Sequence, residues 1–367
     1  MVEIETNLVS SSLCYCKERL VIEMSDKKKI IVGILFGILL LFVWIKFINL
    51  KEVLNYLRKL EFGYIAIASF LYLLSYFIRS LRWRKILTPV CNLKVKRAYF
   101  VWMGGFFLNY IIPIRAGEFA KSYFIKRTEG KSISRTLPSV FIDKVFDSLS
   151  IFVVIGLIPF LDIDISKPLL ILIVILLVVV FLGLGILIIS AIKKDLVVSL
   201  FQRSLFFIPK KYKSKFFEIV EIFIEGIGLF KHHYNILPQL ILLTFTAVLI
   251  DSLYFLCMFR AFGQIIPFPI ILFGYTLIYL SYILPCPPAQ IGSNELIMVI
   301  IFSVGLGLNK EMVSAVMTFA HLLTGILITV LGLISFSYIG VKITDTFRDV
   351  DISKIEDGYK DRIIKND

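Results

Sequence analysis

The sequence has few of the residues that build metal centres, disulfide frameworks or nucleotide sites. Its five cysteines are odd in number and form no CxxC pair, so neither a disulfide framework nor a zinc site is indicated. Two of its three histidines, His232 and His233, are adjacent and would point to different helix faces, so they do not form a ligand pair. No GxxxxGKS or GxxxxGKT sequence occurs, and nothing therefore indicates coupling to ATP. We expect no bound metal and no cofactor.

A contiguous basic face is also missing, although the formal net charge is +13. The lysines and arginines are scattered among segments that border apolar stretches. Nucleic-acid binding needs a contiguous basic face, so we do not expect a nucleic-acid partner. The excess of positive charge instead fits the positive-inside rule and attraction to anionic lipid headgroups.

Apolar residues dominate what the chain does contain. Hydrophobic residues make up 58% of it and the mean hydropathy is +0.87, whereas soluble domains contain about 45–50% apolar residues. Several stretches approach or exceed the roughly 20 residues that span a bilayer. They predict an all-α protein, a polytopic transmembrane helix bundle in the cell membrane. These stretches are 30–48, 63–78, 137–160, 168–192, 237–259 and 312–339.

Two segments have the same arrangement of residue types and look like two copies of one repeat. Each combines a helix-breaking proline, a glycine and a glutamate beside apolar sequence, which is costly in a bilayer core unless the irregular backbone lines a protein cavity. In both copies a second glycine follows the glutamate after 12 positions, and a basic residue follows that glycine after a further 14. The first copy contains Asn109, Pro113, Gly117, Glu118, Gly130 and Lys144, and the second contains Ser281, Pro285, Gly292, Glu295, Gly307 and His321.

Paired, broken hydrophobic segments in two halves are typical of the substrate site of a transporter. The distribution of Lys and Arg predicts that the copies are re-entrant hairpins, 99–127 and 268–306, which enter from opposite faces as an inverted repeat. The chain would then cross the membrane six times, with both termini cytoplasmic. A variant in which each broken segment passes fully through also leaves the halves inverted. In the hairpin arrangement 79–97, 114–135 and 193–236 lie inside, and 161–167 and 260–267 lie outside.

The expected organisation is one membrane domain with polar ends. Met24 would make a natural start, because the residues before it are polar and unpatterned and no cleavable signal peptide is evident. Residues 213–230 have the pattern of an amphipathic helix in the cytoplasmic interface, and a packed surface helix fits that pattern about as well. The units are a poorly structured extension 1–24, a membrane domain 25–340 with halves 63–192 and 237–339 and a cytoplasmic linker 193–236, and a charged cytoplasmic tail 341–367.

The broken segments supply the first candidate residues. They should lie at membrane depth, although a simple surface loop is the alternative for the first copy. The glutamate of the second copy has no basic residue near it in sequence, so it needs a partner or a water-filled cavity. Helix N-termini after the two glycines would aim backbone N–H groups at an anion such as a phosphate. The candidates here are Asn109, Arg115, Gly117, Glu118, Gly292 and Glu295.

Charged residues inside the apolar stretches supply the second set. Asp143 and Asp147 share a helix face, and Lys144 can pair with Asp147 three positions on, although a structural salt bridge near the inner interface is the alternative. Asp251 lies mid-span without a nearby charge in sequence and should face the bundle interior. His321 takes the place of Lys144 in the second copy, where a packing histidine is the alternative.

A basic and aromatic cluster ends the second apolar stretch and is expected to anchor the helix at the membrane interface rather than to bind substrate. Lys121 and Arg127 are likewise expected to be interfacial anchors that tolerate alanine. The cluster consists of Arg79, Arg82, Trp83, Arg84 and Lys85.

These residues together resemble the flippase-like family, which includes the membrane portion of lysylphosphatidylglycerol synthases and the UPF0104 proteins of bacteria and archaea. The resemblance covers roughly residues 25–340 and implies movement of lipids, or lipid-linked groups, between leaflets. Lys144 and His321 depart from the family, which often has arginine there, and Ala289-Gln290 stands where a glycine pair is usual. The matching blocks are Arg79-Ser-Leu-Arg82-Trp83, Asn109 to Glu118, Asp143-Lys144-x-x-Asp147, and Pro285 to Glu295.

The leading hypothesis is a protein that translocates a phospholipid or a polyprenyl-phosphate-linked lipid between leaflets. Arg115 and Lys144 would bind the phosphate of an anionic headgroup, and Glu118 and Glu295 would orient these cations or carry protons. Membrane lipids are then the partners, and the protein is a transporter rather than an enzyme.

Two alternatives stay open. One is a membrane-embedded glycosyl- or aminoacyl-lipid transferase, for which the support is Asp162-x-Asp164, two carboxylates in a loop that could hold a divalent metal. The other is an accessory subunit of a separate lipid-modifying enzyme.

Overall fold

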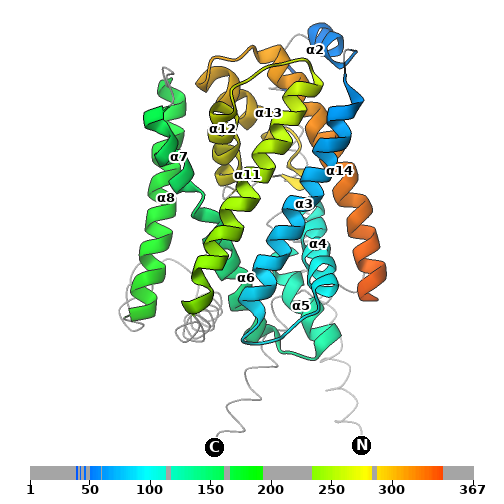
Figure 1. Cartoon of the computed structure of the whole chain (residues 1–367), viewed down its shortest axis with the longest axis vertical. Helices are drawn as coiled ribbons and strands as arrows, with labels where there is room; N and C mark the ends of the chain where they lie inside the picture. Colours follow the sequence, from blue (N-terminus) through cyan, green and yellow to red (C-terminus); the bar gives the residue numbers. More distant parts are fainter. Residues whose placement is uncertain are drawn as a thin grey trace, which may run out of the picture.

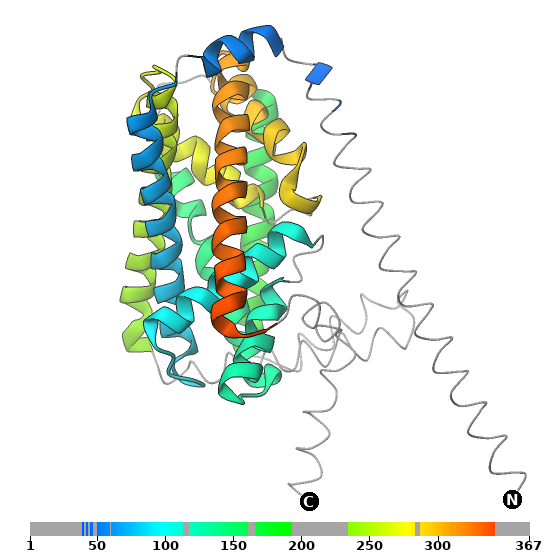
Figure 2. The ribbon, with the colours of Figure 1, turned by 90° about the vertical axis from the view of Figure 1, so that its right-hand side faces the viewer.

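The protein is a bundle of helices, most of which run along one common direction (Figure 1, Figure 2). Every regular element among the described residues is helical. The computed structural model describes residues 39, 42, 45, 46, 50–58, 60–112, 117–160, 166–192, 234–282 and 287–341.

Three helices of the described chain are long and apolar enough to cross a membrane, which supports the predicted transmembrane bundle. They are α3 (Phe62–Leu87), α11 (Leu237–Ala261) and α14 (Lys310–Ile339). Helix α3 packs along α11 through much of its length, and α14 packs on α4 (Figure 1). Two further elements complete the outline, the long α8 (Lys167–Ile192) beside the bundle and the short α2 (Leu50–Leu57) across its upper end (Figure 1).

The first broken segment folds as a helical hairpin in the lower half of the bundle (Figure 1). Its arms are α4 (Val95–Ile111) and α5 (Gly117–Glu129), which pack against each other. The arms meet at Gly117, where a Cβ atom would lie only 2.0 Å from the carbonyl oxygen of Gly105. A glycine is therefore required at this contact, because any side chain would push the two arms apart.

The second broken segment lies in the upper half (Figure 1). Helix α12 (Phe268–Ser281) forms its first arm, and α13 (Ser293–Met298), continued by a π-helical turn η5 (Val299–Gly305), forms the second. Between them the 3-10 turn η4 (Pro288–Gln290) contains two non-glycine residues in the left-handed region, Ala289 at φ 53° and Gln290 at φ 57°. Such backbone costs about 1–3 kcal/mol per residue and persists only where surrounding contacts hold it.

The stretch 137–160 was expected to be one continuous span, and this prediction was wrong. It is divided into α6 (Ile133–Ser148), α7 (Ile151–Leu157) and a 3-10 turn η2 (Ile158–Phe160). The break lies between Ser148 and Ile151. There the Ser148 hydroxyl donates to the Val145 carbonyl, and the Ser150 hydroxyl donates to the Asp147 carbonyl. Serine side chains that bond to the backbone compete with the helical ladder in this way.

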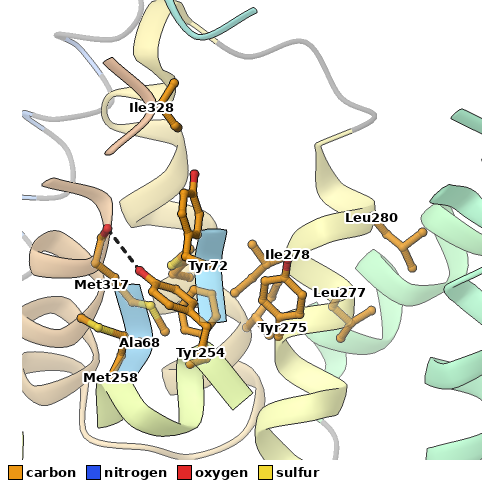
Figure 3. Close-up of a cluster of buried hydrophobic side chains, with 14 of the residues drawn as sticks. Ala68, Tyr72, Tyr254, Met258, Tyr275, Leu277, Ile278, Leu280, Met317 and Ile328 are labelled. Carbon is orange, nitrogen blue, oxygen red and sulfur yellow. Dashed lines mark hydrogen bonds between the residues drawn. The ribbon is translucent and has the colours of Figure 1, made fainter. Parts of the chain in front are cut away.

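Aromatic side chains fill much of the interior between α3, α11 and α12. Tyr72 of α3 packs on Tyr254 of α11 with ring centroids 5.5 Å apart (Figure 3). Tyr275 of α12 packs on Phe255 of α11. The Tyr254 hydroxyl donates to the Ala320 carbonyl of α14, so the buried phenol is satisfied.

The outer faces of the long helices are apolar and exposed. Leu182 of α8, Leu242 of α11 and Leu322 of α14 are 62%, 67% and 63% exposed. Exposed apolar surface on this scale is unfavourable in water and natural in lipid. The predicted amphipathic helix 213–230, the extension 1–24, the Asp162-x-Asp164 loop and nearly all of the tail 341–367 lie outside the described residues.

Candidate functional site

Two arginines of α3 point into the bundle, where they were not expected. Arg79 and Arg82 are only 3% and 1% exposed, so the interpretation of these two residues as interfacial anchors was wrong. The lower part of α3 packs against α4, α6 and α11, and Arg79 and Arg82 lie on the face that these helices cover. A buried guanidinium is costly unless carboxylates surround it.

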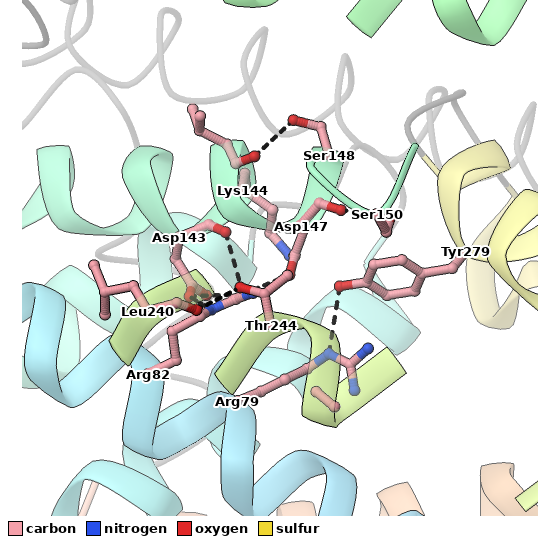
Figure 4. A network of polar contacts seen from close by, with 12 residues as sticks. Arg79, Arg82, Asp143, Lys144, Asp147, Ser148, Ser150, Leu240, Thr244 and Tyr279 are labelled. Atoms are coloured by element: carbon pink, nitrogen blue, oxygen red, sulfur yellow. Dashed lines mark hydrogen bonds and ion pairs between the residues drawn. The ribbon is translucent and has the colours of Figure 1, made fainter. Parts of the chain in front are cut away.

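Arg82 binds both carboxylates of α6 (Figure 4). Its Nε donates to Asp143 Oδ1 at 2.8 Å, and its Nη2 contacts the carboxylate of Asp147. Its Nη1 donates to the Thr244 hydroxyl of α11 at 3.0 Å. The structure thus brings Asp143 and Asp147 together on one helix face, and the residue that joins them to α11 is an arginine of α3.

Arg79 makes the corresponding contacts one turn higher. Its Nη2 lies 2.6 Å from Asp251 Oδ2. Its Nε donates to the Tyr279 hydroxyl of α12 at 3.3 Å (Figure 4). Asp251 also accepts from the Tyr275 hydroxyl at 2.6 Å. Asp251 is 3% exposed and lies inside the bundle, where it links α11 to α3 and α12.

Lys144 connects this set to the first hairpin. Its Nζ lies 3.0 Å from Glu118 Oε1 and 3.2 Å from Asp147 Oδ2. Glu118 also accepts from Asn109 at 2.8 Å and from Lys121 at 2.8 Å. The side chain of Lys144 is 38% exposed, which makes it the accessible cation of the set.

Lys121 is 1% exposed and lies 4.6 Å from the ring centroid of Trp102, so its interpretation as an interfacial anchor was wrong. A cation over an indole face is stabilised by the ring quadrupole. We call the connected residues the arginine network; its charged members are Arg79, Arg82, Glu118, Lys121, Asp143, Lys144, Asp147 and Asp251.

Glu295 and His321 form a second centre, the histidine pair. The carboxylate of Glu295 contacts Nδ1 of the His321 imidazole, and it accepts the backbone N–H of Gly292 at 2.8 Å. The ring's Nε2 lies 2.8 Å from the Ala289 carbonyl and 3.5 Å from the Tyr110 hydroxyl of the first hairpin. The N–H of Gly292, expected to face an anion, is thus bound by a carboxylate of the same segment.

The two centres occupy matching places in the repeat. Glu118 contacts Lys144 and Glu295 contacts His321, and the two partners are 26 positions apart in each pair. The matched spacing in sequence therefore corresponds to two matched acid–base contacts in space. Arg115 lies outside the described residues, as do Pro113 and Pro285.

Sequence reasoning missed several members of this site, although one signal was present. Three aspartates in apolar helices need cationic partners, and Arg79 directly follows the apolar stretch 63–78. The spacing of three residues between Arg79 and Arg82 places both on one helix face. Nothing in the sequence indicated that Tyr275 and Tyr279 would provide the hydroxyls. No group of three or more His, Cys, Asp or Glu residues suited to a metal occurs within the described part of the chain.

The comparison with protein families identifies the family of the chain. Residues 30–332 match the family described as the lysylphosphatidylglycerol synthase transmembrane region. The chain belongs to this family. The resemblance stated from sequence is thereby confirmed, and the protein is a membrane protein of a lipid-related family.

One curated relative is named as a glycosyltransferase. Glycosyltransferase AglD of Haloferax volcanii is 26% identical over 133 residues, which make up 35% of this chain and 21% of that protein. The chain thus spans only about a fifth of this relative's length. No solved structure matches the chain.

Proposed function

We propose that this protein moves a lipid with a phosphate-bearing headgroup, a phospholipid or a polyprenyl-phosphate-linked lipid, between the leaflets of the membrane. The observation that carries the proposal is the arginine network, a set of charges enclosed by helices whose outer faces are apolar. Ionisable groups at such depth are costly and typically mark a substrate or ion pathway. The headgroup would follow this polar interior while the tails stay in lipid.

Lys144 is the residue proposed to receive the headgroup. Its side chain is 38% exposed, whereas those of Arg79 and Arg82 are 4% and 1% exposed. An ammonium has three N–H donors, and Glu118 and Asp147 accept two of them among the described contacts. The third is then available to a phosphate oxygen. Glu118 and Asp147 hold the ammonium in place, which is the role expected for a glutamate beside a phosphate-binding cation.

The two hairpins are proposed to be re-entrant and to enter the membrane from opposite sides. The support is that α4 and α5 lie in one half of the bundle, whereas α12 and α13 lie in the other (Figure 1). Inverted repeats of this kind allow one half to rock against the other around a central site. With the basic segments inside, both termini are cytoplasmic.

Purified protein in proteoliposomes tests this proposal. A fluorescent phospholipid in both leaflets is quenched from outside with dithionite, and loss beyond the outer-leaflet fraction reports movement. Lys144→Gln should slow movement by roughly 10–150-fold, because a charge-assisted contact contributes about 1.5–3 kcal/mol. Lys126→Gln is the matched control, since Lys126 is an exposed lysine of the same hairpin. Wild-type vesicles that behave like protein-free vesicles, or Lys144→Gln vesicles that behave like wild type, would contradict the proposal.

A second candidate function follows from the relative's name. Glycosyltransferase AglD is far longer than the matched region, so the matched part is one portion of a protein named for group transfer. By analogy, this chain would act beside a separate lipid-modifying enzyme or carry a transferase activity itself. Transfer of a radiolabelled sugar to a polyprenyl phosphate by the purified chain alone would favour the transferase over the translocator.

A further inference from the structure

His321 is surrounded in an unusual way for a neutral histidine. Both ring nitrogens lie against acceptors, Nδ1 against the Glu295 carboxylate and Nε2 against the Ala289 carbonyl at 2.8 Å. A neutral imidazole has one N–H and one lone pair, so it can donate to only one of these two acceptors. The lone pair would then face an oxygen. Only the imidazolium, which has two N–H groups, satisfies both contacts.

The acceptor at Nε2 belongs to the backbone turn of the second hairpin. Ala289 and its neighbour Gln290 are both in the left-handed region, at φ 53° and φ 57°. Glycine populates this region freely, whereas these two residues are held in it by the contacts around them. The bond from His321 of α14 to the Ala289 carbonyl is one of those contacts. Loss of that bond removes a constraint from the strained turn.

The neutral ring has another partner within reach. The Tyr110 hydroxyl, on the last turn of the first hairpin's α4, lies 3.5 Å from Nε2, and the two rings are nearly perpendicular at 88°. A hydroxyl can donate to the lone pair that the neutral ring presents at Nε2. Deprotonation would therefore exchange the Ala289 carbonyl of the second hairpin for the Tyr110 hydroxyl of the first.

The other elements packed on α14 bring no competing charge to this ring within the described residues. Glu295 of α13 is the charged group in contact with it. Tyr254 of α11 donates to the adjacent Ala320 carbonyl, and η5 contains no titratable residue. The two arginines of α3 discussed above are bound to the aspartates of the arginine network, and α2, with Lys51 and Glu52, lies across the upper end of the bundle (Figure 1).

We infer that His321 is a proton-binding site and that the bound proton holds the turn at Ala289 against α14. We call this proton-dependent contact between His321 and Ala289 the latch. With the proton bound, the imidazolium donates to Glu295 and to Ala289, and the second hairpin is held. When the proton leaves Nε2, the ring keeps its N–H to Glu295 and accepts from Tyr110, and the turn is released. Under the proposed function, the proton is then the coupling ion for lipid movement. The latch itself does not depend on the proposed function.

The matching position in the first copy gives the contrast. Lys144 there is a donor with no lone pair and contacts Glu118. The first copy therefore carries a fixed cation, and the second carries a cation that becomes neutral when the imidazolium loses one proton. The two copies have matching acid–base contacts, but the positive charge is permanent in the first copy and depends on a bound proton in the second.

Electron paramagnetic resonance tests the latch without any lipid assay. A nitroxide is attached at Ile291→Cys, an exposed position beside the turn, in a background with the five native cysteines replaced. The spectrum should change from ordered to mobile as the pH is raised from 5 to 9. A label at Leu322→Cys, exposed on α14 next to His321, should show no such transition.

Two substitutions of the ring decide the origin of the transition. His321→Lys should keep the label ordered at every pH, because a lysine stays charged and can donate to both oxygens. His321→Gln should also abolish the transition. Tyr110→Phe should move its midpoint up by about half to one pH unit, because the neutral state loses one hydrogen bond. His232→Gln and His233→Gln are the matched controls and should titrate like wild type.

The outcomes separate the latch from the proposed transport. A wild-type transition that both His321 variants abolish supports the latch, whereas no wild-type transition, or one that persists in either variant, overturns it. In proteoliposomes with an imposed pH gradient, wild-type lipid movement should follow the gradient and His321→Lys movement should not. A latch that titrates in a protein that moves no lipid would reject the proposed function and keep the proton site.

Discussion

Arg82 shows how a single side chain can tie three helices together. It starts on α3, binds two carboxylates of α6 and donates to a hydroxyl of α11. Each of these groups would be costly in the interior alone, and each has the same guanidinium as a partner. A planar group with five N–H donors on three nitrogen atoms suits this task, whereas an ammonium carries its three donors on a single atom.

Removal of this guanidinium should therefore destabilise the fold. Arg82→Gln leaves the buried Asp143 carboxylate without a cation and leaves Asp147 with Lys144 alone, which should cost about 3–5 kcal/mol of unfolding free energy. Lys85→Gln, on the same helix, removes only an exposed bond to Gln239 and should change stability by less than about 0.5 kcal/mol. Thermal unfolding in detergent micelles compares the two variants. Equal stability would show that the carboxylates find other partners.

At the scale of elements, the first hairpin depends on one place where the backbones of its two arms are in direct contact. In the first hairpin Gly117 abuts the carbonyl oxygen of Gly105 and the backbone nitrogen of Asn109, which lie 2.0 and 2.5 Å from where a Cβ would stand. The approach also brings Asn109 within reach of Glu118, so the glycine contact positions a side-chain contact of the site.

Gly117→Ala should separate the arms of this hairpin. The added methyl group has no room against rigid backbone, and overpacking of this kind costs about 1–3 kcal/mol. Gly156→Ala in α7 is the control, because a Cβ at that position meets nothing within 4 Å and alanine favours a helix. Melting temperatures and lipid movement, measured for both variants, test whether the glycine contact holds the two arms together. A Gly117→Ala protein as stable as the control would mean that the arms adjust without loss.

The elements differ in how far they could be predicted from sequence. The two broken segments were found because proline, glycine and glutamate recur at matched spacing beside apolar residues. Proline and glycine interrupt a helix through their own backbone preferences, so this pattern is visible in the local sequence. The division of α6 from α7 was missed, because Ser148 and Ser150 lie in a stretch whose average is strongly apolar. The inward direction of Arg79 and Arg82 was missed for another reason. It depends on which helices enclose α3, and that is a long-range property.

At the scale of the whole molecule, the arrangement predicts which surfaces each side of the membrane can reach. Single cysteines at Lys126, on α5, and at Ile265, between α11 and α12, are exposed positions near the entrances of the two hairpins. In intact cells a membrane-impermeant maleimide should label Ile265→Cys, whereas Lys126→Cys should react only after the membrane is opened. Labelling of Lys126→Cys from outside would refute the proposed orientation.

The charges of the arginine network also have a consequence for voltage. Its four cations face four carboxylates, so this part of the protein carries no net charge within the described residues. A neutral arginine network does no net electrical work when it moves as one unit, whereas a net charge moved fully across the membrane contributes about 2.3 kcal/mol per 100 mV. Under the proposed function, a bound anionic headgroup supplies that net charge. A membrane potential that is negative inside would then favour export of the bound anionic lipid. It would neither favour nor oppose the return of the empty arginine network.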